Sequence, residues 1–463
     1  MTDDLPPRLT TDLFRTASGA RLQEIYRTLF HRMAEREDEL HVFTDGGFSP
    51  RRVLDVLDDL EHHWPDPRVR PPLFGVPVGV KDLYRTAGYA IHAGSLLPAS
   101  CFRGPEADIV TALKKLGCVV MGITQSSEFA GAAPASTCNP LNPRHTPGGS
   151  SSGSAAGVAA GYFPLALGTQ TKGSVARPAS YCGVIGVKPG RGPLSTAGIV
   201  PFSESVDQPG FFCSSMSDAA LVLDALVVPD SARPGVPRFW SLAVPRGPYL
   251  EEADPVCLKL FEAVCRKLSE SEALLIRDCD VLPDWPSIRE IHERLTSAEL
   301  AATHDRLWKK FGCLVRQPTR DCVARGREYG QQAILRGCSS AESLRARLAQ
   351  YMEENHIDAF IAPAATGPAP AGLDSTGDPV MNVPWTHAGL PVLCLPMGSV
   401  SPDGTFTVGR SAMGADSLPV GSRAPGFRTH PSCTRASRRA SPRISLQVHC
   451  RFRPPPGTVP AWA

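Results

Sequence analysis

Residues 147–189 read PGGSSSGSAAGVAAGYFPLALGTQTKGSVARPASYCGVIGVKP, and the rest of the chain is organised around this stretch. A Gly/Ser loop (148–154) opens a segment made almost wholly of Ala, Gly and Val, and a second Gly/Ser turn (169–174) follows it. Glycine permits positive φ angles and close approach of the backbone to a ligand. Serine beside such bare backbone can act as a nucleophile or a proton relay, and the free N–H groups can bind an oxyanion. The stretch therefore predicts an active site laid out along the sequence.

Upstream of this stretch, residues 73–83 (LFGVPVGVKDL) predict a strand that ends by presenting Lys81. Val76, Val78 and Val80 alternate with residues of the opposite face, and that period of two is typical of a strand. Lys81 and Gly79 share the second face, so the missing side chain of Gly79 is expected to leave space beside the lysine.

Helical and apolar patterns alternate through the rest of the chain and predict an α/β sheet. The helices expected from apolar spacing are 20–40, 51–63, 109–116, 151–160, 217–227 with Ser217 as its cap, 255–268, 288–307 and 343–356. The further strands expected from short apolar runs are 118–123, 163–167, 182–187, 357–362 and 391–396.

Composition limits the functional classes. The chain has 463 residues, of which 42% are hydrophobic and 20% charged, and its net charge is +2, so no overall field favours nucleic acid or an acidic membrane. Its 14 cysteines form no CxxC pair, which argues against zinc and for reduced thiols in the cytoplasm. The N-terminus lacks the pattern of a signal peptide, and no apolar run is long enough to span a membrane.

The last part of the chain differs in character. After Asp416 there is no Asp or Glu, while eight arginines accumulate among Ser and Pro without a helical or strand period. This pattern predicts a disordered basic tail over 421–463, after a domain over 20–420 and a lead segment over 1–19.

Lys81, Ser150 and Ser174 supply the groups that amide cleavage needs, provided the fold brings Lys81 under the Gly/Ser loop. The reaction requires a nucleophile, a base and donors for the oxyanion. A lysine serves as the base only when it is neutral, and burial lowers its pKa in that direction.

The same residues resemble the amidase signature family. Its members share a GGSS(G/S)GS loop, a (D/Q)T-x-GS turn, an RPA segment and a CGxxGxKP segment, which correspond here to 148–154, 170–174, 177–179 and 182–189. The 24-residue step from Ser150 to Ser174 agrees as well, and so does the strand ending in VKD at 80–82. The resemblance covers about residues 20–400, and it implies one large domain with a mixed sheet covered by helices on both faces.

The resemblance implies a triad in which Ser174 is the nucleophile, Ser150 relays the proton after a cis peptide bond, and Lys81 is the base. The backbone N–H groups of Thr171, Lys172, Gly173 and Ser174 would bind the oxyanion. An acyl-enzyme would form and be hydrolysed, with no cofactor or metal. Activity should rise with pH between about 7 and 9, as Lys81 loses its proton.

Other residues near these motifs receive structural interpretations. Ser151 and Ser152 are expected to cap a helix or bond within the loop, and Arg177 to support the site rather than to bind substrate. Cys182 is expected to be a small buried group. Asp207 is expected to satisfy a loop near the site. Trp385 is expected to pack in the core, with a place in the pocket wall as the alternative.

Two features depart from the family. Lys172 stands where members carry a small or apolar residue, so its side chain either crowds the pocket, attracts a carboxylate or points outward. The terminal pattern begins at 417–421 (SLPVG) and then gives way to the Arg/Ser/Pro tail. A frameshifted or spliced end would explain this, and the departure predicts that an edge strand and its covering helix are missing.

Three alternatives remain open. Residues 149–153 fit G-x-S-x-G, but no strand pattern precedes them and no histidine is clearly placed for an α/β-hydrolase. A non-catalytic scaffold would keep its role without Ser174. The amidase component of a tRNA-dependent amidotransferase would need partner proteins. The expected partner is a small-molecule amide, without nucleic acid or membrane, and the sequence leaves a homodimer and the identity of the amide open.

Overall fold

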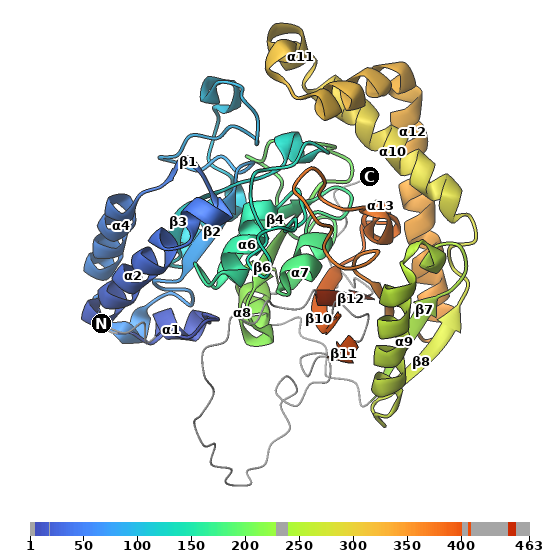
Figure 1. The fold of residues 1–463 in the computed structure, drawn as a ribbon, viewed down its shortest axis with the longest axis horizontal. Coiled ribbons are helices and arrows are strands. Elements are labelled where there is room, and N and C mark those ends of the chain that lie inside the picture. The colour runs from blue at the N-terminus through green and yellow to red at the C-terminus, as the bar shows by residue number, and fades with distance from the viewer. Residues whose placement is uncertain (1–4, 18, 228–238, 401–405, 409–442, 451–463) are drawn as a thin grey trace.

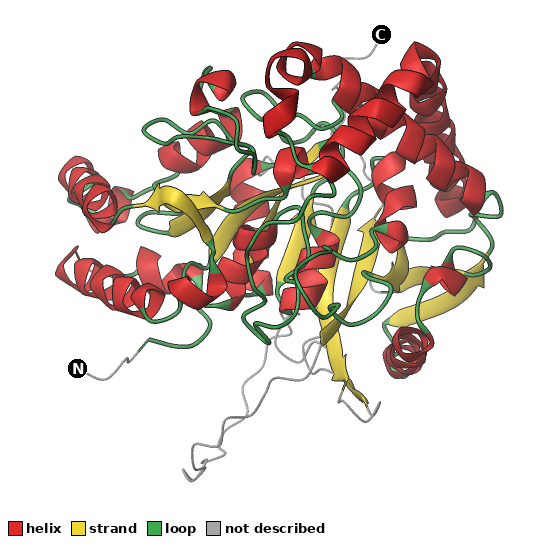
Figure 2. Cartoon of the chain, turned by 45° about the horizontal axis from the view of Figure 1, so that its top comes forward, coloured by secondary structure: helices red, strands yellow, loops and turns green. Residues whose placement is uncertain are grey.

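A mixed β-sheet runs through the protein and carries the predicted site along its central strands (Figures 1 and 2). The computed structural model describes residues 5–17, 19–227, 239–400, 406–408 and 443–450. Within these residues twelve strands form one sheet in the order β1-β3-β2-β4-β6-β5-β10-β12-β9-β7-β8, with β11 paired to β10. The strands are β1 (Phe43–Phe48), β2 (Pro77–Lys81), β3 (Val119–Thr124), β4 (Leu165–Gln170), β5 (Ile185–Lys188), β6 (Gln208–Cys213), β7 (Trp240–Pro245), β8 (Leu274–Cys279), β9 (Ala359–Pro363), β10 (Val392–Val400), β11 (Phe406–Val408) and β12 (Arg443–Cys450).

Helices lie on both sides of this sheet, as Figure 2 shows. They are α1 (Thr11–Arg15), α2 (Gly19–Ala34), α3 (Glu37–Leu40), α4 (Pro50–His63), α5 (Asp108–Lys115), α6 (Ser152–Ala159), α7 (Ala176–Cys182), α8 (Met216–Leu226), α9 (Pro255–Ser269), α10 (Trp285–Thr303), α11 (Asp305–Phe311), α12 (Gln317–Glu354) and α13 (Val383–His387). The α/β fold with a mixed, helix-covered sheet that the sequence predicts is confirmed.

The central strands bring the predicted motifs together. Strand β2 pairs in parallel with β3 on one side and with β4 on the other, and all of their residues are buried. Parallel strands covered on both faces are apolar throughout, which explains the continuous apolar runs of these segments. Because β2 ends at Lys81 and β4 leads into the 169–174 turn, both motifs reach the same edge of the sheet.

Helices α10 and α12 pack along each other and run across the upper right of Figure 1. Their close approach depends on Gly326, because a Cβ built there would lie 1.9 Å from the carbonyl oxygen of Ser297. Helix α12 is interrupted at Gly330, whose φ of 61° lies in the region that glycine adopts without cost.

Most of the expected helices and strands are found within a few residues of their predicted bounds, but the helix expected at 343–356 is only the last part of α12, which begins at Gln317. Other elements were not expected, namely α1, α7, α13, β1, β6, β7, β8 and β11. The cap of α8 is Ser215 rather than Ser217, since the Ser215 side chain accepts a hydrogen bond from Asp218 N. The space beside Gly79 holds the ring of Phe163, which a Cβ at Gly79 would meet at 2.5 Å.

The predicted basic tail contains one ordered element. Strand β12 lies in the interior of the sheet, antiparallel to both β10 and β9, so the expectation of an irregular tail does not hold for Arg443–Cys450. Its Gln447 is buried and donates to the carbonyl oxygens of Met381 and Pro363 at 2.6 and 2.8 Å. The departure at 417–421 and the remainder of 421–463 lie outside the described residues.

The structure also bears on the cysteines and on the absence of long apolar runs noted in the sequence. The twelve cysteines from Cys101 to Cys394 are all free thiols. Among the described residues, no helix combines the length and the apolar character that crossing a membrane requires.

Candidate active site

Lys81 ends strand β2 in a fully buried position and contacts two hydroxyl groups. Its Nζ lies 2.8 Å from Ser150 Oγ and 2.7 Å from Thr169 Oγ1. Burial lowers the pKa of Lys81 well below its ordinary range, and the carboxylate of Asp207 opposes this effect only in part. A lysine in this environment can exist as the neutral amine that a general base requires.

The two hydroxyls are suited to orient a neutral amine, which has two N–H donors and one lone pair. Thr169 Oγ1 can accept one N–H, and the lone pair can then accept the hydroxyl proton of Ser150. The structure thus brings the predicted base and the predicted relay into direct contact.

The peptide bond between Gly149 and Ser150 is cis, as the family resemblance implies. Arg177 Nη2 donates to the carbonyl oxygen of Gly149 at 2.7 Å, and Ser127 N donates to that of Ser150 at 3.0 Å. Gly149 is required here, because a Cβ would lie 2.6 Å from Thr376 Cγ2. Arg177 therefore holds the relay loop in place, which is the supporting role expected of it.

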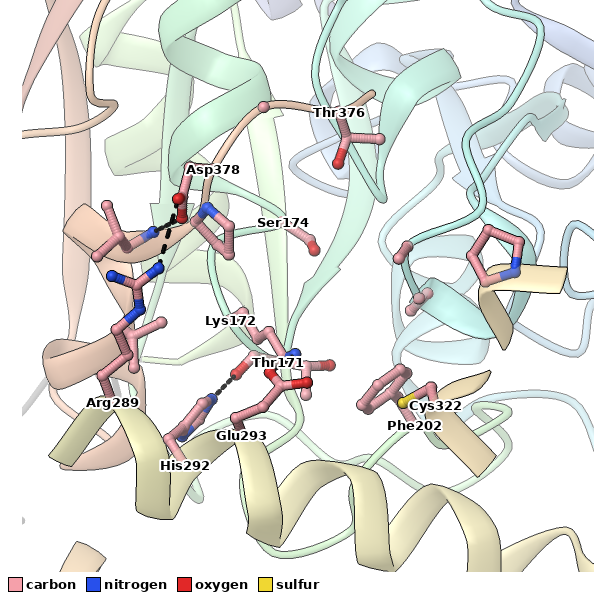
Figure 3. Close-up of a pocket in the computed structure, with 18 of the residues that line it drawn as sticks. Thr171, Lys172, Ser174, Phe202, Arg289, His292, Glu293, Cys322, Thr376 and Asp378 are labelled. Atoms are coloured by element: carbon pink, nitrogen blue, oxygen red, sulfur yellow. Dashed lines mark hydrogen bonds and ion pairs between the residues drawn. The ribbon is translucent and has the colours of Figure 1, made fainter. Parts of the chain in front are cut away.

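Ser174 follows the second Gly/Ser turn and lines a cavity of about 630 Å³. It is 5% exposed, and Figure 3 shows it beside this cavity, together with Thr171 and Lys172 of the same turn. Lys81 and Ser150 are not among the lining residues. Within the described residues, hydrogen bonds join Lys81 to Ser150 but do not join Ser150 to Ser174.

The turn that carries Ser174 is fixed at both ends by side chains. Gln170 Oε1 accepts from the N–H groups of Val175 and Ala176 at 2.9 and 3.0 Å. Gln170 Nε2 also donates to Thr386 Oγ1, which lies 3.0 Å from the carbonyl oxygen of Lys172. These contacts leave the backbone of Lys172 and Gly173 little freedom.

Asp207 satisfies the neighbouring loop, as predicted, and also contacts the turn. Its carboxylate accepts from Phe202 N and Ser203 N at 2.7 and 3.0 Å, and from the hydroxyl of Thr171. Burial raises the pKa of Asp207 to about 6, although these hydrogen bonds lower it.

Lys172 turns into the cavity and forms an ion pair with Glu293 of α10. The side chain of Lys172 therefore does not point outward. The carboxylate that this lysine attracts is Glu293 of the protein's own chain. Arg325 of α12 lies 3.7 Å from the same glutamate, which therefore faces two cations. The pKa of Glu293 falls below its ordinary value because these charges outweigh the effect of burial.

The remaining residues that the sequence singled out have structural roles. The Ser152 hydroxyl donates to the carbonyl oxygen of Gly148 within the loop, whereas the Ser151 hydroxyl bonds to Thr169 of β4, and neither side chain caps α6. Cys182 is buried. Trp385 stacks on His449 with ring centroids 4.1 Å apart, and it packs in the core rather than lining the cavity.

Three residues at the site were not predicted. Thr169 lies at the end of β4, where the 169–174 turn begins, and alternates with Thr171, a pattern that could have placed both hydroxyls on one side of the strand end. The sequence showed Gln170 as the first residue of the (D/Q)T-x-GS motif but gave no sign of its hydrogen bonds to the turn. His292 of α10 lies 121 residues from the turn, yet its Nε2 is 3.1 Å from the carbonyl oxygen of Thr171, as Figure 3 shows. No local sequence signal indicates such a contact.

Comparison with known proteins gives matches along most of the chain. A sequence model of the family described as Amidase matches residues 24–424. The glutamyl-tRNA(Gln) amidotransferase of Lachnospira eligens has an A subunit that is 31% identical over 281 residues, which are 56% of this chain and 57% of that protein's length. The corresponding protein of Exiguobacterium sibiricum is 28% identical over 441 residues, or 84% of this chain and 90% of that protein.

A solved structure described as an amidase shares the fold. It superimposes with a TM-score of 0.77 and 23% sequence identity, covering 95% of this chain and 94% of the other.

Proposed function

Because the chain belongs to the amidase family, we propose that it hydrolyses a carboxylic amide to an acid and an amine or ammonia. One observation carries this proposal: Lys81 is completely buried, its pKa is lowered, and its Nζ lies 2.8 Å from the hydroxyl of Ser150. A buried amine bonded to a serine hydroxyl has no evident structural use that an apolar residue would not serve better.

In the proposed reaction, the lone pair of Lys81 takes the proton of the Ser150 hydroxyl, and Ser150 takes the proton of Ser174. The Ser174 oxygen then attacks the amide carbon. The negative charge of the tetrahedral intermediate is stabilised by N–H groups of the 171–174 turn. The proton returns through Ser150 to the leaving nitrogen, the C–N bond breaks, and an acyl ester remains on Ser174.

Water completes the cycle by the same route. It donates its proton to Ser150 and Lys81 as its oxygen attacks the ester, and the collapse of this second intermediate releases the acid and restores the Ser174 hydroxyl. Each proton that the relay takes up is returned, so the reaction needs no redox partner.

The cavity supports a polar substrate. Its wall carries Lys172, Arg289 and Arg325 as well as Glu293 and Asp378. These five side chains form ion pairs with one another: Arg289 lies 3.6 Å from Asp378, and Glu293 pairs with Lys172 and Arg325. We therefore place aliphatic and amino-acid amides ahead of long fatty amides.

The test is hydrolysis of a panel of aliphatic, aryl, fatty and amino-acid amides by the wild-type chain and by Ser174→Ala. The proposal expects release of the acid for at least one class and its complete loss in the variant. Ser152→Ala is the matched control, because Ser152 bonds only within the loop, and it should retain most of the activity. Equal rates for wild type and Ser174→Ala would refute the proposed nucleophile.

A second candidate follows from the relatives, which belong to glutamyl-tRNA(Gln) amidotransferases. In that case the ammonia released at Ser174 would be used by a partner rather than discharged. Co-purification of partner proteins with this chain, together with glutamine as the preferred amide, would favour this candidate. A chain that hydrolyses its best substrate fully without partners would favour the free amidase.

A further inference from the structure

Two buried histidines lie beside the turn that carries the proposed nucleophile, and one of them, His292, is also part of the cavity wall. His292 of α10 and His387, the last residue of α13, approach each other with 3.1 Å between their Nδ1 atoms. His292 Nε2 lies 3.1 Å from the carbonyl oxygen of Thr171, and His387 Nε2 lies 3.1 Å from Ser340 Oγ on α12. Three helices are therefore connected to the turn through one line of hydrogen bonds.

We infer that His292 and His387 are positioning residues, and that the one-directional hydrogen-bond chain from Ser340 through both rings to Thr171 aligns the oxyanion-binding N–H groups. The inference rests on the proposed function, because it concerns how the 171–174 turn binds the oxyanion.

The direction of the chain follows from its fixed end. A carbonyl oxygen only accepts, so His292 Nε2 carries a hydrogen and donates it to Thr171. In a neutral ring the Nδ1 of His292 is then an acceptor, and the Nδ1 of His387 must donate to it. His387 Nε2 is left as an acceptor for the hydroxyl of Ser340. Each ring thus has one allowed tautomer.

The charges around the pair favour the neutral rings that this order requires. Burial is the main cause that lowers the pKa of His292 well below its ordinary value, and the charges of Lys172 and Arg191 add to it. Burial and Arg191 lower the pKa of His387 to about 4. The carboxylate of Glu293, on the same helix as His292, is engaged by Lys172. Both rings are therefore neutral at neutral pH.

The consequence for the turn comes from peptide geometry. In a trans peptide the C=O of one residue and the N–H of the next lie in one plane and point in opposite directions. Holding the carbonyl of Thr171 therefore fixes the direction of the Lys172 N–H. The Thr386 hydroxyl lies 3.0 Å from the carbonyl oxygens of both Lys172 and Asn382, so it constrains the Gly173 N–H only when its single hydrogen points to Lys172. Within the described part of the chain, neither N–H group has an acceptor, which leaves both available to an oxyanion.

The first test reads the tautomers without any need for activity. In protein labelled with 15N-histidine, NMR of the imidazole nitrogens identifies which nitrogen of each ring carries hydrogen, with His292→Gln and His387→Asn used for assignment. The inference expects hydrogen on Nε2 of His292 and on Nδ1 of His387. The opposite tautomer at either ring, or a charged ring at pH 7, would overturn it.

The second test separates positioning from simple support of the fold. His292→Leu should lower kcat roughly 10- to 100-fold with KM within about threefold, because misaligned donors act in the transition state. His292→Gln retains an N–H at the position of Nε2 and should remain within about fivefold of wild type.

Tyr26 provides the matched control, because its buried hydroxyl also donates to a backbone carbonyl, that of Gly75 at 2.9 Å, before the start of β2 and so at the end of the strand opposite to Lys81. Tyr26→Phe should reduce stability and leave kcat within about threefold. Equal losses of kcat in His292→Leu and Tyr26→Phe, or a loss confined to KM, would overturn the positioning role. Failure of the wild type to hydrolyse any amide would overturn the proposed function and the positioning role together, while the tautomer measurement would still stand.

Discussion

Thr169→Val tests whether the second hydroxyl on Lys81 orients the base. Valine has nearly the shape of threonine, and the site is buried, so the variant removes a hydrogen-bonding group and little volume. The lost contact is the 2.7 Å bond between Thr169 Oγ1 and Lys81 Nζ. The bond from Lys81 to Ser150 stays available, so the base is loosened but not removed.

The size of the effect follows from this single bond. A neutral hydrogen bond contributes about 0.5–1.5 kcal/mol net, which corresponds to about 2- to 13-fold in rate if all of it is lost in the transition state. Thr169 is not in the cavity wall, so KM should stay close to the wild-type value. A fall in kcat at constant KM would thus report the orientation of the base rather than the binding of the substrate.

The assay is steady-state kinetics on the best amide, with thermal unfolding in parallel. Thr319→Val is the control, because the Thr319 hydroxyl is buried without a partner in the described part of the chain and its removal should change neither kcat nor stability adversely. An unchanged kcat in Thr169→Val, or a loss that falls on KM, would refute the orienting role. A loss beyond about 10³-fold would mean that Thr169 acts in the chemistry itself.

Other substitutions probe the same account. Lys81→Met should lower kcat by about 10²–10⁴-fold, and it should not reduce stability at pH 7. The pKa of Lys81 is lower in the folded chain than in the unfolded chain, so the unfolded chain binds more protons at pH 7 and the buried lysine lowers the free energy of unfolding. The gain in stability from methionine should therefore shrink as the pH rises toward about 10, where the lysine of the unfolded chain loses its proton. Wild-type activity should rise with pH through the lowered pKa of Lys81; a flat profile contradicts this. Glu293→Gln frees Lys172, so KM for an amide bearing a carboxylate should fall about two- to fivefold relative to a neutral amide. Gly326→Ala should lower the free energy of unfolding by roughly 1–3 kcal/mol, since its Cβ would overlap the carbonyl oxygen of Ser297; unchanged denaturant midpoints would exclude this.

The sequence predicted the parts of the site that local patterns encode. Alternation in 73–83 placed Lys81 at a strand end, and the Gly/Ser motifs placed Ser150 in a loop and Ser174 in a turn. The contact between Lys81 and Ser150 was implied only by the family resemblance, because Ser150 lies in the loop before α6 and no local pattern places that loop over the end of β2.

Other parts of the site arise only when distant segments pack together. His292, Glu293 and Thr386 reach the turn from helices more than 100 residues away, and no period or spacing in the sequence records that approach. For Lys172 the sequence left three outcomes open, and the position of Glu293 decides among them. Strand β12 was missed although Ile444, Leu446 and Val448 alternate with polar residues, because the Arg-, Ser- and Pro-rich sequence on either side indicated an irregular tail.

The central claim is that Ser174 forms the acyl-enzyme with Lys81 as the ultimate base. The most direct measurement is mass spectrometry of the protein quenched during turnover of its best amide, followed by peptide mapping. The account predicts an added mass equal to the acyl group on the peptide that contains Ser174, present in wild type and absent from both Ser174→Ala and Lys81→Met. An acyl group on another residue, or on Ser174 at an undiminished rate in Lys81→Met, would contradict it.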